Sequence, residues 1–219
     1  SDLFFENDYI EELILSNEYC EYDVENLVFF RKLSTRSNAS FNYPNAISQI
    51  PLSIGKFIRL KKLVIGGNWQ EGTIHKKFLF TDIESLIFLQ NLEELNISNG
   101  VLESLRGIEN LINIRTLYVN NNELLSILEL SNNTKLEHLY IGNNKIQDLK
   151  SIENFKKLKT LDFHSNEVSD IKPLNLLFKK TRTVDAKWTK NAINIYNNPL
   201  DEVFVNIVRK SENTLDSED

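Results

Sequence analysis

A small set of side chains in this 219-residue sequence could support chemistry or binding, and most of them lie in its second half. Two histidines and a carboxylate could do general acid–base work or hold a zinc ion, and three tyrosines could anchor a partner at an interface. These candidates are His138, Asp162 and His164, and Tyr118, Tyr140 and Tyr196. Whether they act together depends on the elements that position them.

Other routes to catalysis find little support in the sequence. It has no phosphate-binding loop, no dinucleotide-binding glycine pattern and no His-Glu-x-x-His. Cys20 is the single cysteine, and a nucleophilic cysteine needs its base within hydrogen-bond reach. If the chain stacks repeats as strands, His138 lies roughly 25 Å from Cys20 at the spacing of strands in a sheet. We therefore expect Cys20 to be a buried, inert thiol.

The elements that carry the candidate residues are copies of one repeat. Four segments align without gaps and begin 22 residues apart, at Leu92, Ile114, Leu136 and Leu158. Three of them continue to an asparagine, so the template is L-x-x-L-x-L-x-x-N-x-L. The asparagines are Asn122, Asn144 and Asn166.

Weaker copies of the template begin at residues 10, 30, 60 and 190. They bring the expected number of copies to eight, and three of the copies carry an insertion of about ten residues. In three of these weaker copies the asparagine position of the template is also filled, by Asn38, Asn68 and Asn198.

The repeat has the physical pattern of a stacked strand. Apolar and polar residues alternate over its first half, as in a half-buried β-strand. Apolar residues recur six and three positions before most copies, with the spacing of a short helix or 3₁₀ turn. The asparagine after each strand can bond the backbone of its own turn and of the neighbouring turn. Because one copy cannot bury its leucines alone, we expect a single solenoid.

The repeat resembles the leucine-rich repeat family over most of the chain. The 22-residue copies resemble internalin-type bacterial repeats, and residues 50–55 before Leu60 resemble longer, plant-type copies. The resemblance implies an α/β leucine-rich repeat solenoid of about eight repeats, with a curved parallel β-sheet on the concave side and short helices or 3₁₀ turns on the convex side. It also implies a protein-interaction module that binds its partner through the concave face.

Composition narrows the class of protein further. The formal net charge of −6 disfavours a general nucleic-acid binder, and no run of apolar residues is long enough to cross a membrane. A single cysteine excludes a disulfide scaffold. The N-terminus lacks a signal-peptide pattern, so we expect a cytoplasmic protein, monomeric in isolation, although the start of the chain could be trimmed.

The sequence divides into one repeat domain and a tail. We expect a leucine-rich repeat domain over residues 1–210, with a cap or truncated start at 1–9 and a C-terminal cap helix at 201–210, followed by an acidic disordered tail at 211–219. The insertion between Asn68 and Leu92 is either the core of an enlarged repeat or a binding loop. Basic residues of the late insertion form either a solvated face or a docking patch: Lys179, Lys180, Arg182, Lys187 and Lys190.

Strand alternation predicts which side chains face outward. One outward row contains Tyr118, Tyr140 and Asp162, with His138 on one side of it and His164 and Tyr196 on the other. The separation of the two histidines, roughly 14 Å from strand dimensions, argues against a zinc site. We therefore expect no metal, no cofactor and no catalysis, and a partner-binding surface made of all six residues.

A second interpretation stays open. Asn198-Pro199-Leu200 and the residues after it resemble the end of bacterial repeat arrays that precede a GTPase or another effector domain. The chain would then be a sensory or regulatory segment of a larger multidomain enzyme.

Overall fold

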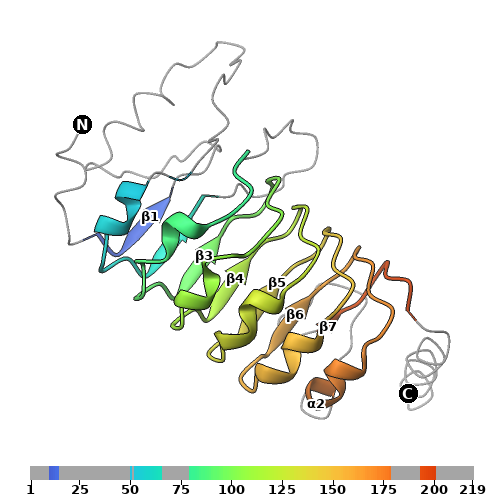
Figure 1. The fold of residues 1–219 in the computed structure, drawn as a ribbon. Coiled ribbons are helices and arrows are strands. Elements are labelled where there is room, and N and C mark those ends of the chain that lie inside the picture. Colours follow the sequence, from blue (N-terminus) through green and yellow to red (C-terminus); the bar gives the residue numbers. More distant parts are fainter. Residues whose placement is uncertain (1–9, 15–49, 51, 66–78, 179–192, 201–219) are drawn as a thin grey trace, which may run out of the picture.

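The computed structural model describes residues 10–14, 50, 52–65, 79–178 and 193–200. Within them, seven short strands form one sheet in which every neighbouring pair is parallel and the order in the sheet follows the order in the chain (Figure 1). The strands are β1 (Glu12–Ile14), β2 (Lys62–Val64), β3 (Glu94–Asn96), β4 (Thr116–Tyr118), β5 (His138–Tyr140), β6 (Thr160–Asp162) and β7 (Ile193–Asn194).

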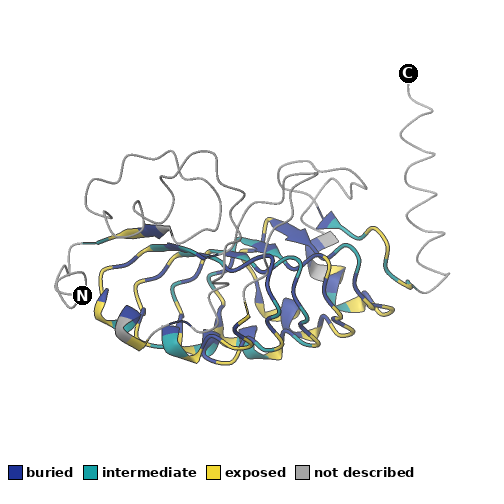
Figure 2. Ribbon diagram, turned by 90° about the horizontal axis from the view of Figure 1, so that it is seen from above, coloured by how far each residue is buried: buried dark blue, intermediate teal, exposed yellow. Residues whose placement is uncertain are grey.

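Short 3₁₀ turns return the chain from one strand to the next. They are η2 (Leu52–Lys56), η3 (Glu84–Leu86), η4 (Ile108–Asn110), η5 (Leu128–Asn132), η6 (Lys150–Asn154) and η7 (Lys172–Leu174), and one α-helical turn, α2 (Asn175–Phe178), follows η7 directly. The strands and the turns lie on opposite sides of the array (Figure 2). We call these two surfaces the sheet face and the turn face. The expected α/β leucine-rich repeat solenoid is confirmed.

The core lies between the two faces and is made of the predicted apolar positions. The central leucine of each strand is fully covered, for example Leu95, Leu117 and Leu139, and each such side chain contributes about 1.5–3 kcal/mol by leaving water. In the enlarged repeat Phe80, Ile83 and Leu89 are buried, whereas Leu79 and Phe88 are more than half exposed, so only part of the described insertion is core.

The predicted asparagine ladder is present and joins successive repeats. Asn144 Nδ2 donates to the carbonyl oxygens of Val119 in the preceding repeat, at 3.0 Å, and of Ile141 in its own repeat, at 2.9 Å, and Asn144 Oδ1 accepts from the Leu124 amide at 3.1 Å. Buried backbone groups need partners, and one amide side chain here serves several of them. Equivalent bonds are made by Asn122, Asn166 and Asn198.

A second series of asparagines adopts left-handed backbone conformation just after the strands. Asn99, Asn121 and Asn143 have φ of 66°, 58° and 53°. Asparagine tolerates this region better than most residues with a Cβ atom. The Asn121 side chain also donates to Asn99 Oδ1 at 2.8 Å. Asparagines therefore serve the turns as well as the ladder.

A third recurrent feature was not predicted from the sequence. A side-chain oxygen two residues before the start of a 3₁₀ turn accepts its first amide hydrogen, as Asp82 does for Glu84 at 3.1 Å. This local bond offers the backbone a partner where the turn begins. The same bond recurs at Ser126, Asp148 and Asp170, before η5, η6 and η7.

One asparagine occupies a core position where the neighbouring copies have an apolar residue, Leu111 and Phe155. Asn133 is fully buried in the returning segment, three residues before Leu136. Its Nδ2 donates to the carbonyl oxygens of Ile108 at 3.0 Å and Leu111 at 2.9 Å, which compensates the burial of its amide nitrogen.

The structure corrects the predicted order of copies at the N-terminal end. β1 pairs directly with β2, with Leu13 opposite Leu63, so the copy expected at residue 30 supplies no strand between them. A charge pattern in the sequence could have indicated this. The charge at the second position alternates in sign from the copy at residue 60 to the copy at residue 158, and Lys61 pairs with Glu11 at 2.9 Å. A strand between them would have placed Arg31 beside Lys61.

Several predictions concern residues outside the described ranges. They are the cap or start at 1–9, Cys20, the ladder residues Asn38 and Asn68, the basic late insertion, the cap helix at 201–210 and the tail at 211–219. They stay predictions. Among the described residues, no helix has the length and apolar character needed to cross a membrane.

The ladder gives a first testable prediction. Asn144→Ala should lower the free energy of unfolding by about 2–4 kcal/mol, because it leaves several buried backbone groups without a partner and each costs about 1–3 kcal/mol. Chemical denaturation measures the change. The matched control is Asn154→Ala on the turn face, where the side chain is exposed and we expect a change below about 0.5 kcal/mol. Equal effects of the two substitutions would contradict a structural ladder.

The alternating charges at the second position of the copies predict that the stability of the fold depends on pH. Hydrogen bonds from Lys159 and Arg115 lower the pKa of the Glu137 carboxyl below its ordinary value. Glu137 therefore favours the folded state at pH values above the pKa of the unfolded chain, about 4.3, and this contribution is lost as the pH falls through the folded-state pKa. Glu137→Gln should flatten the acid side of the stability curve, measured by denaturation at several pH values. The control Glu153→Gln should leave the curve unchanged.

Candidate functional site

The register of the sheet brings the predicted site residues into adjacent rows on the sheet face. Tyr118 on β4 lies opposite Tyr140 on β5, and Tyr140 lies opposite Asp162 on β6. His138 belongs to the row on the N-terminal side, between Thr116 and Thr160. The outward rows expected from strand alternation are therefore the rows observed.

Two tyrosines form the centre of the site. The rings of Tyr118 and Tyr140 are stacked, with their centroids 4.5 Å apart and an angle of 6° between the planes. Neighbouring strands lie about 4.8 Å apart, so tyrosines at equivalent positions stack without leaving their strands. Both side chains are half-buried. The pair is held on rigid elements and still presents its edges to the surface.

The hydroxyls of the pair are held in their neutral form. Burial first, and then the Tyr140 hydroxyl and the Glu94 carboxylate, raise the pKa of Tyr118 to about 12. Burial is also the main cause that raises the pKa of Tyr140, and the Asp162 carboxylate adds to it. At neutral pH both groups are therefore hydrogen-bonding phenols and neither is a nucleophile or a base.

Asp162 and His164 form a hydrogen-bonded pair beside the tyrosines. His164 Nδ1 lies 2.6 Å from Asp162 Oδ1, and His164 Nε2 lies 3.0 Å from Asn143 Nδ2. Because an amide nitrogen can only donate, Nε2 accepts and Nδ1 carries the proton. Both ring nitrogens of His164 are thus engaged, which leaves neither available as a general base or a metal ligand.

The structure corrects one property expected of Asp162. Strand alternation predicted an exposed side chain, but Asp162 is only 3% exposed, and all three residues of β6 are buried. Its Oδ2 atom is buried without a hydrogen-bond partner. Outward direction from a strand therefore does not guarantee exposure here.

The remaining two predicted residues lie at different distances from this centre. His138 Nδ1 is 2.9 Å from Thr160 Oγ1, next to the tyrosine row. Tyr196 follows β7 and is 65% exposed, two strands beyond Tyr140 in the order of the sheet. The structure thus brings Tyr118, Tyr140, Asp162 and His164 together and leaves Tyr196 at the C-terminal margin. In the part of the chain that the structure describes, no group of three or more histidine, cysteine, aspartate or glutamate side chains could hold a metal ion.

Sequence reasoning missed the residue that makes room for His164. A Cβ atom on Gly142 would lie 2.3 Å from two atoms of the His164 ring, so the imidazole rests directly on the Gly142 backbone. The neighbouring copies have Asn120 and His164 at this position, and a glycine directly before the histidine was the available signal.

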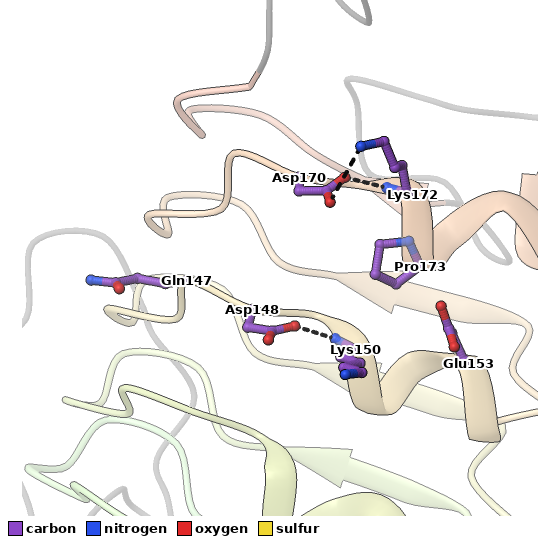
Figure 3. Close-up of a pocket in the computed structure, with 7 residues that line it drawn as sticks. All are labelled: Gln147, Asp148, Lys150, Glu153, Asp170, Lys172 and Pro173. Atoms are coloured by element: carbon purple, nitrogen blue, oxygen red, sulfur yellow. Dashed lines mark hydrogen bonds and ion pairs between the residues drawn. The ribbon is translucent and has the colours of Figure 1, made fainter.

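A hollow on the turn face offers a second place to consider, and Figure 3 shows the residues that line it. They are Gln147, Asp148, Lys150, Glu153, Asp170, Lys172 and Pro173. Asp148 Oδ1 accepts from the Lys150 amide at 2.6 Å and Asp170 Oδ1 from the Lys172 amide at 2.9 Å. Each carboxylate accepts a hydrogen bond from the first amide of a turn, η6 or η7. This structural role explains why aspartates occupy these two positions.

Comparisons with known proteins agree with the observed architecture. Residues 134–176 match the family model described as Leucine Rich repeats (2 copies). No curated protein matches the chain in sequence.

Solved structures share the fold. An internalin (InlF) of Listeria monocytogenes is 22% identical with a TM-score of 0.59, and the match covers 74% of this chain and 42% of that one. A leucine-rich repeat protein of Leptospira interrogans is 22% identical with a TM-score of 0.56, over 71% of this chain and 36% of that one. A plant peptide hormone receptor in complex with RGF2 is 21% identical with a TM-score of 0.51, over 69% and 23%. The chain thus spans less than half the length of these three proteins.

The surroundings of the tyrosine pair predict that the Tyr118 phenol ionises at an unusually high pH. The Tyr118 phenol should ionise near pH 12 in the folded protein and near pH 10 in denaturant, where its surroundings are lost. Because the folded-state pKa is raised, the stability that Tyr118 contributes is present below about pH 10 and is lost as the pH rises toward 12. Ultraviolet titration of the intact chain and of Tyr118→Phe isolates this phenol. Ionisation of Tyr118 near pH 10 in the folded protein would contradict the structure.

Proposed function

We propose that this chain, which has the leucine-rich repeat fold, is a protein-interaction module that binds a protein partner through its sheet face. The observation that supports the proposal is the stacked tyrosine pair, Tyr118 and Tyr140, held half-exposed on two central strands. The proposed binding surface also includes His138, Asp162, His164 and Tyr196.

The chemistry of the surface suits a protein partner. Tyrosine combines a large apolar ring with a polar hydroxyl, and such residues often provide much of the binding energy at interfaces. The rings here are already packed against each other, so binding costs little further side-chain entropy. Polar, half-buried side chains flank the pair, including Asn96, Thr116 and Asn120, and they can exchange hydrogen bonds with a partner.

The comparisons support the proposal at the level of the class. Among the structures with the same fold, the plant peptide hormone receptor was solved in complex with RGF2. The proposed function requires no catalytic step and no cofactor. The expectations of a monomer and of a cytoplasmic location stay predictions. The alternative of a regulatory segment in a larger enzyme gains no specific observation from the described residues.

The experiment uses the intact chain as bait and compares it with the double variant Tyr118→Ala/Tyr140→Ala. Quantitative mass spectrometry of captured proteins should show one or a few partners that the double variant retains at least about tenfold less well, since each hot-spot side chain is worth about 2 kcal/mol or more. Because the pair is partly buried, the variant should also lose stability, about 1 kcal/mol from the lost ring pairing and more from the buried area of the two rings. Binding must therefore be measured where both proteins are fully folded.

Phe88→Ala provides the matched control. Phe88 is an aromatic side chain that is 58% exposed after the 3₁₀ turn η3, away from the tyrosine pair. Its loss should leave partner capture unchanged. Partners that the double variant retains as well as the intact chain does would place the binding surface elsewhere.

A further inference from the structure

Positive side chains gather at the edge of the solenoid where the chain enters strands β4, β5 and β6. Residues one and three positions before each strand form two rows there, because the strands are in register. The row next to the strands contains Arg115, Glu137 and Lys159, and the outer row contains Asn113, Lys135 and Lys157. We call the four cations of these rows the basic edge: Arg115, Lys135, Lys157 and Lys159.

The basic edge is accessible from solvent. The side chains of Arg115 and Lys159 are 49% and 56% exposed. Lys157 is exposed too, and Lys135 is half-buried. Leu158, which separates Lys157 from Lys159, is buried, so the chain directs its two neighbours away from the core. A partner can therefore reach these cations while the core stays as it is.

The carboxylates beside the basic edge do not neutralise it. Glu137 accepts hydrogen bonds from both Arg115 and Lys159, so one carboxylate serves two cations. The other carboxylate, Glu93, lies 3.5 Å from Arg115, at the end of the row farthest from Lys159. Four cations therefore share two carboxylates, and the excess of positive charge lies toward β6.

The outer row holds the cations that lack a carboxylate. Lys135 Nζ donates to an amide oxygen, Asn113 Oδ1, at 2.6 Å, and this neutral partner leaves the lysine charge uncompensated. Among the residues that the structure describes, neither Lys135 nor Lys157 forms an ion pair with a carboxylate. Because the chain as a whole has a formal net charge of −6, this local excess of positive charge runs against its overall balance.

The spacing of the cations suits a short acidic segment of a protein. Lys135 and Lys157 take equivalent positions in neighbouring repeats, roughly 5 Å apart at the spacing of strands. Lys157 and Lys159 are separated by one residue and so lie no more than about 7 Å apart. Neighbouring residues of a peptide have separations of this order. Nucleic acid fits less well, because Glu137 places a negative charge among the cations and the basic edge has no aromatic ring on which a base could stack.

We propose that the basic edge is a docking surface for an acidic segment of a partner protein, in which several glutamate or aspartate residues follow one another. The inference goes beyond the proposed function, because the basic edge lies outside the surface built around Tyr118 and Tyr140. Exposed ion pairs are individually weak and are screened by salt, so the docking surface guides and orients an acidic partner more than it holds one.

The test uses the intact chain, isotope-labelled and observed by NMR at the amides of Lys135, Lys157 and Lys159. The probe is the acetylated and amidated pentapeptide Glu-Asp-Glu-Asp-Glu, and its uncharged counterpart is Gln-Asn-Gln-Asn-Gln. The acidic peptide should shift these amides in a saturable manner, and the uncharged peptide should bind at least about tenfold more weakly. Raising the salt from about 0.01 M to about 1 M shortens the Debye length from about 30 Å to about 3 Å, so it should weaken binding of the acidic peptide by a similar factor.

Substitutions locate the binding. Lys157→Gln/Lys159→Gln should lower the affinity for the acidic peptide at least about fivefold. The matched control is Lys150→Gln/Lys172→Gln, which removes the same charge from two exposed positions of the turn face and should change the affinity less than about twofold. Lys157→Gln alone should melt as the unaltered chain does and still weaken binding at least about twofold, which separates docking from folding.

Four results would overturn the inference. They are the absence of a saturable shift, equal binding of the two peptides, equal losses in the two double variants, and tighter binding at the same amides of a thymidine oligonucleotide with the same number of charges. The last result would identify the basic edge as a nucleic-acid surface. The proposed function is tested separately, because Tyr118→Ala/Tyr140→Ala leaves every residue of the basic edge in place.

Discussion

The hydrogen bonds of the buried asparagine ladder are the constraint on which the rest of this structure depends. The strands are at most three residues long. The backbone carbonyl and amide groups that follow each strand are buried and need hydrogen-bond partners other than water. Asn144 satisfies three carbonyl oxygens and one amide hydrogen there, and its donors reach into the preceding repeat. Each repeat is therefore held at one distance and one register from its neighbour.

That fixed register is what creates a surface. Once equivalent residues lie opposite each other at the spacing of a parallel sheet, the side chains between the leucines form continuous rows. Two successive tyrosines in one row must then stack, and the observed separation of 4.5 Å is close to the spacing of the strands themselves. The row changes character at β6, where Asp162 follows Tyr140. Because Asp162 is buried, the exposed part of this row is interrupted after the tyrosine pair.

The sequence predicted some of the candidate site and not the rest. The outward rows of the site were predictable, because the 22-residue spacing of the copies and the alternation within each strand can be read directly from the sequence. Three features were not. Asp162 is buried although its strand directs it outward, Gly142 supports the His164 ring, and Asn143 engages the far nitrogen of that ring. The last two depend on contacts between residues 21 or 22 positions apart, which the pattern of one repeat does not contain.

The sequence by itself determined the solenoid, the leucine core and the ladder, because burial of apolar side chains and satisfaction of backbone groups recur at the same positions in most copies. It did not determine which copies are neighbours: β1 pairs with β2, and the copy expected at residue 30 does not lie between them. A weak copy fits the template by composition, but a strand must also satisfy the edges and charges of its neighbours. The pairing of strands in the tertiary structure decided that point, as it decided that one carboxylate oxygen on the sheet face would be buried without a partner.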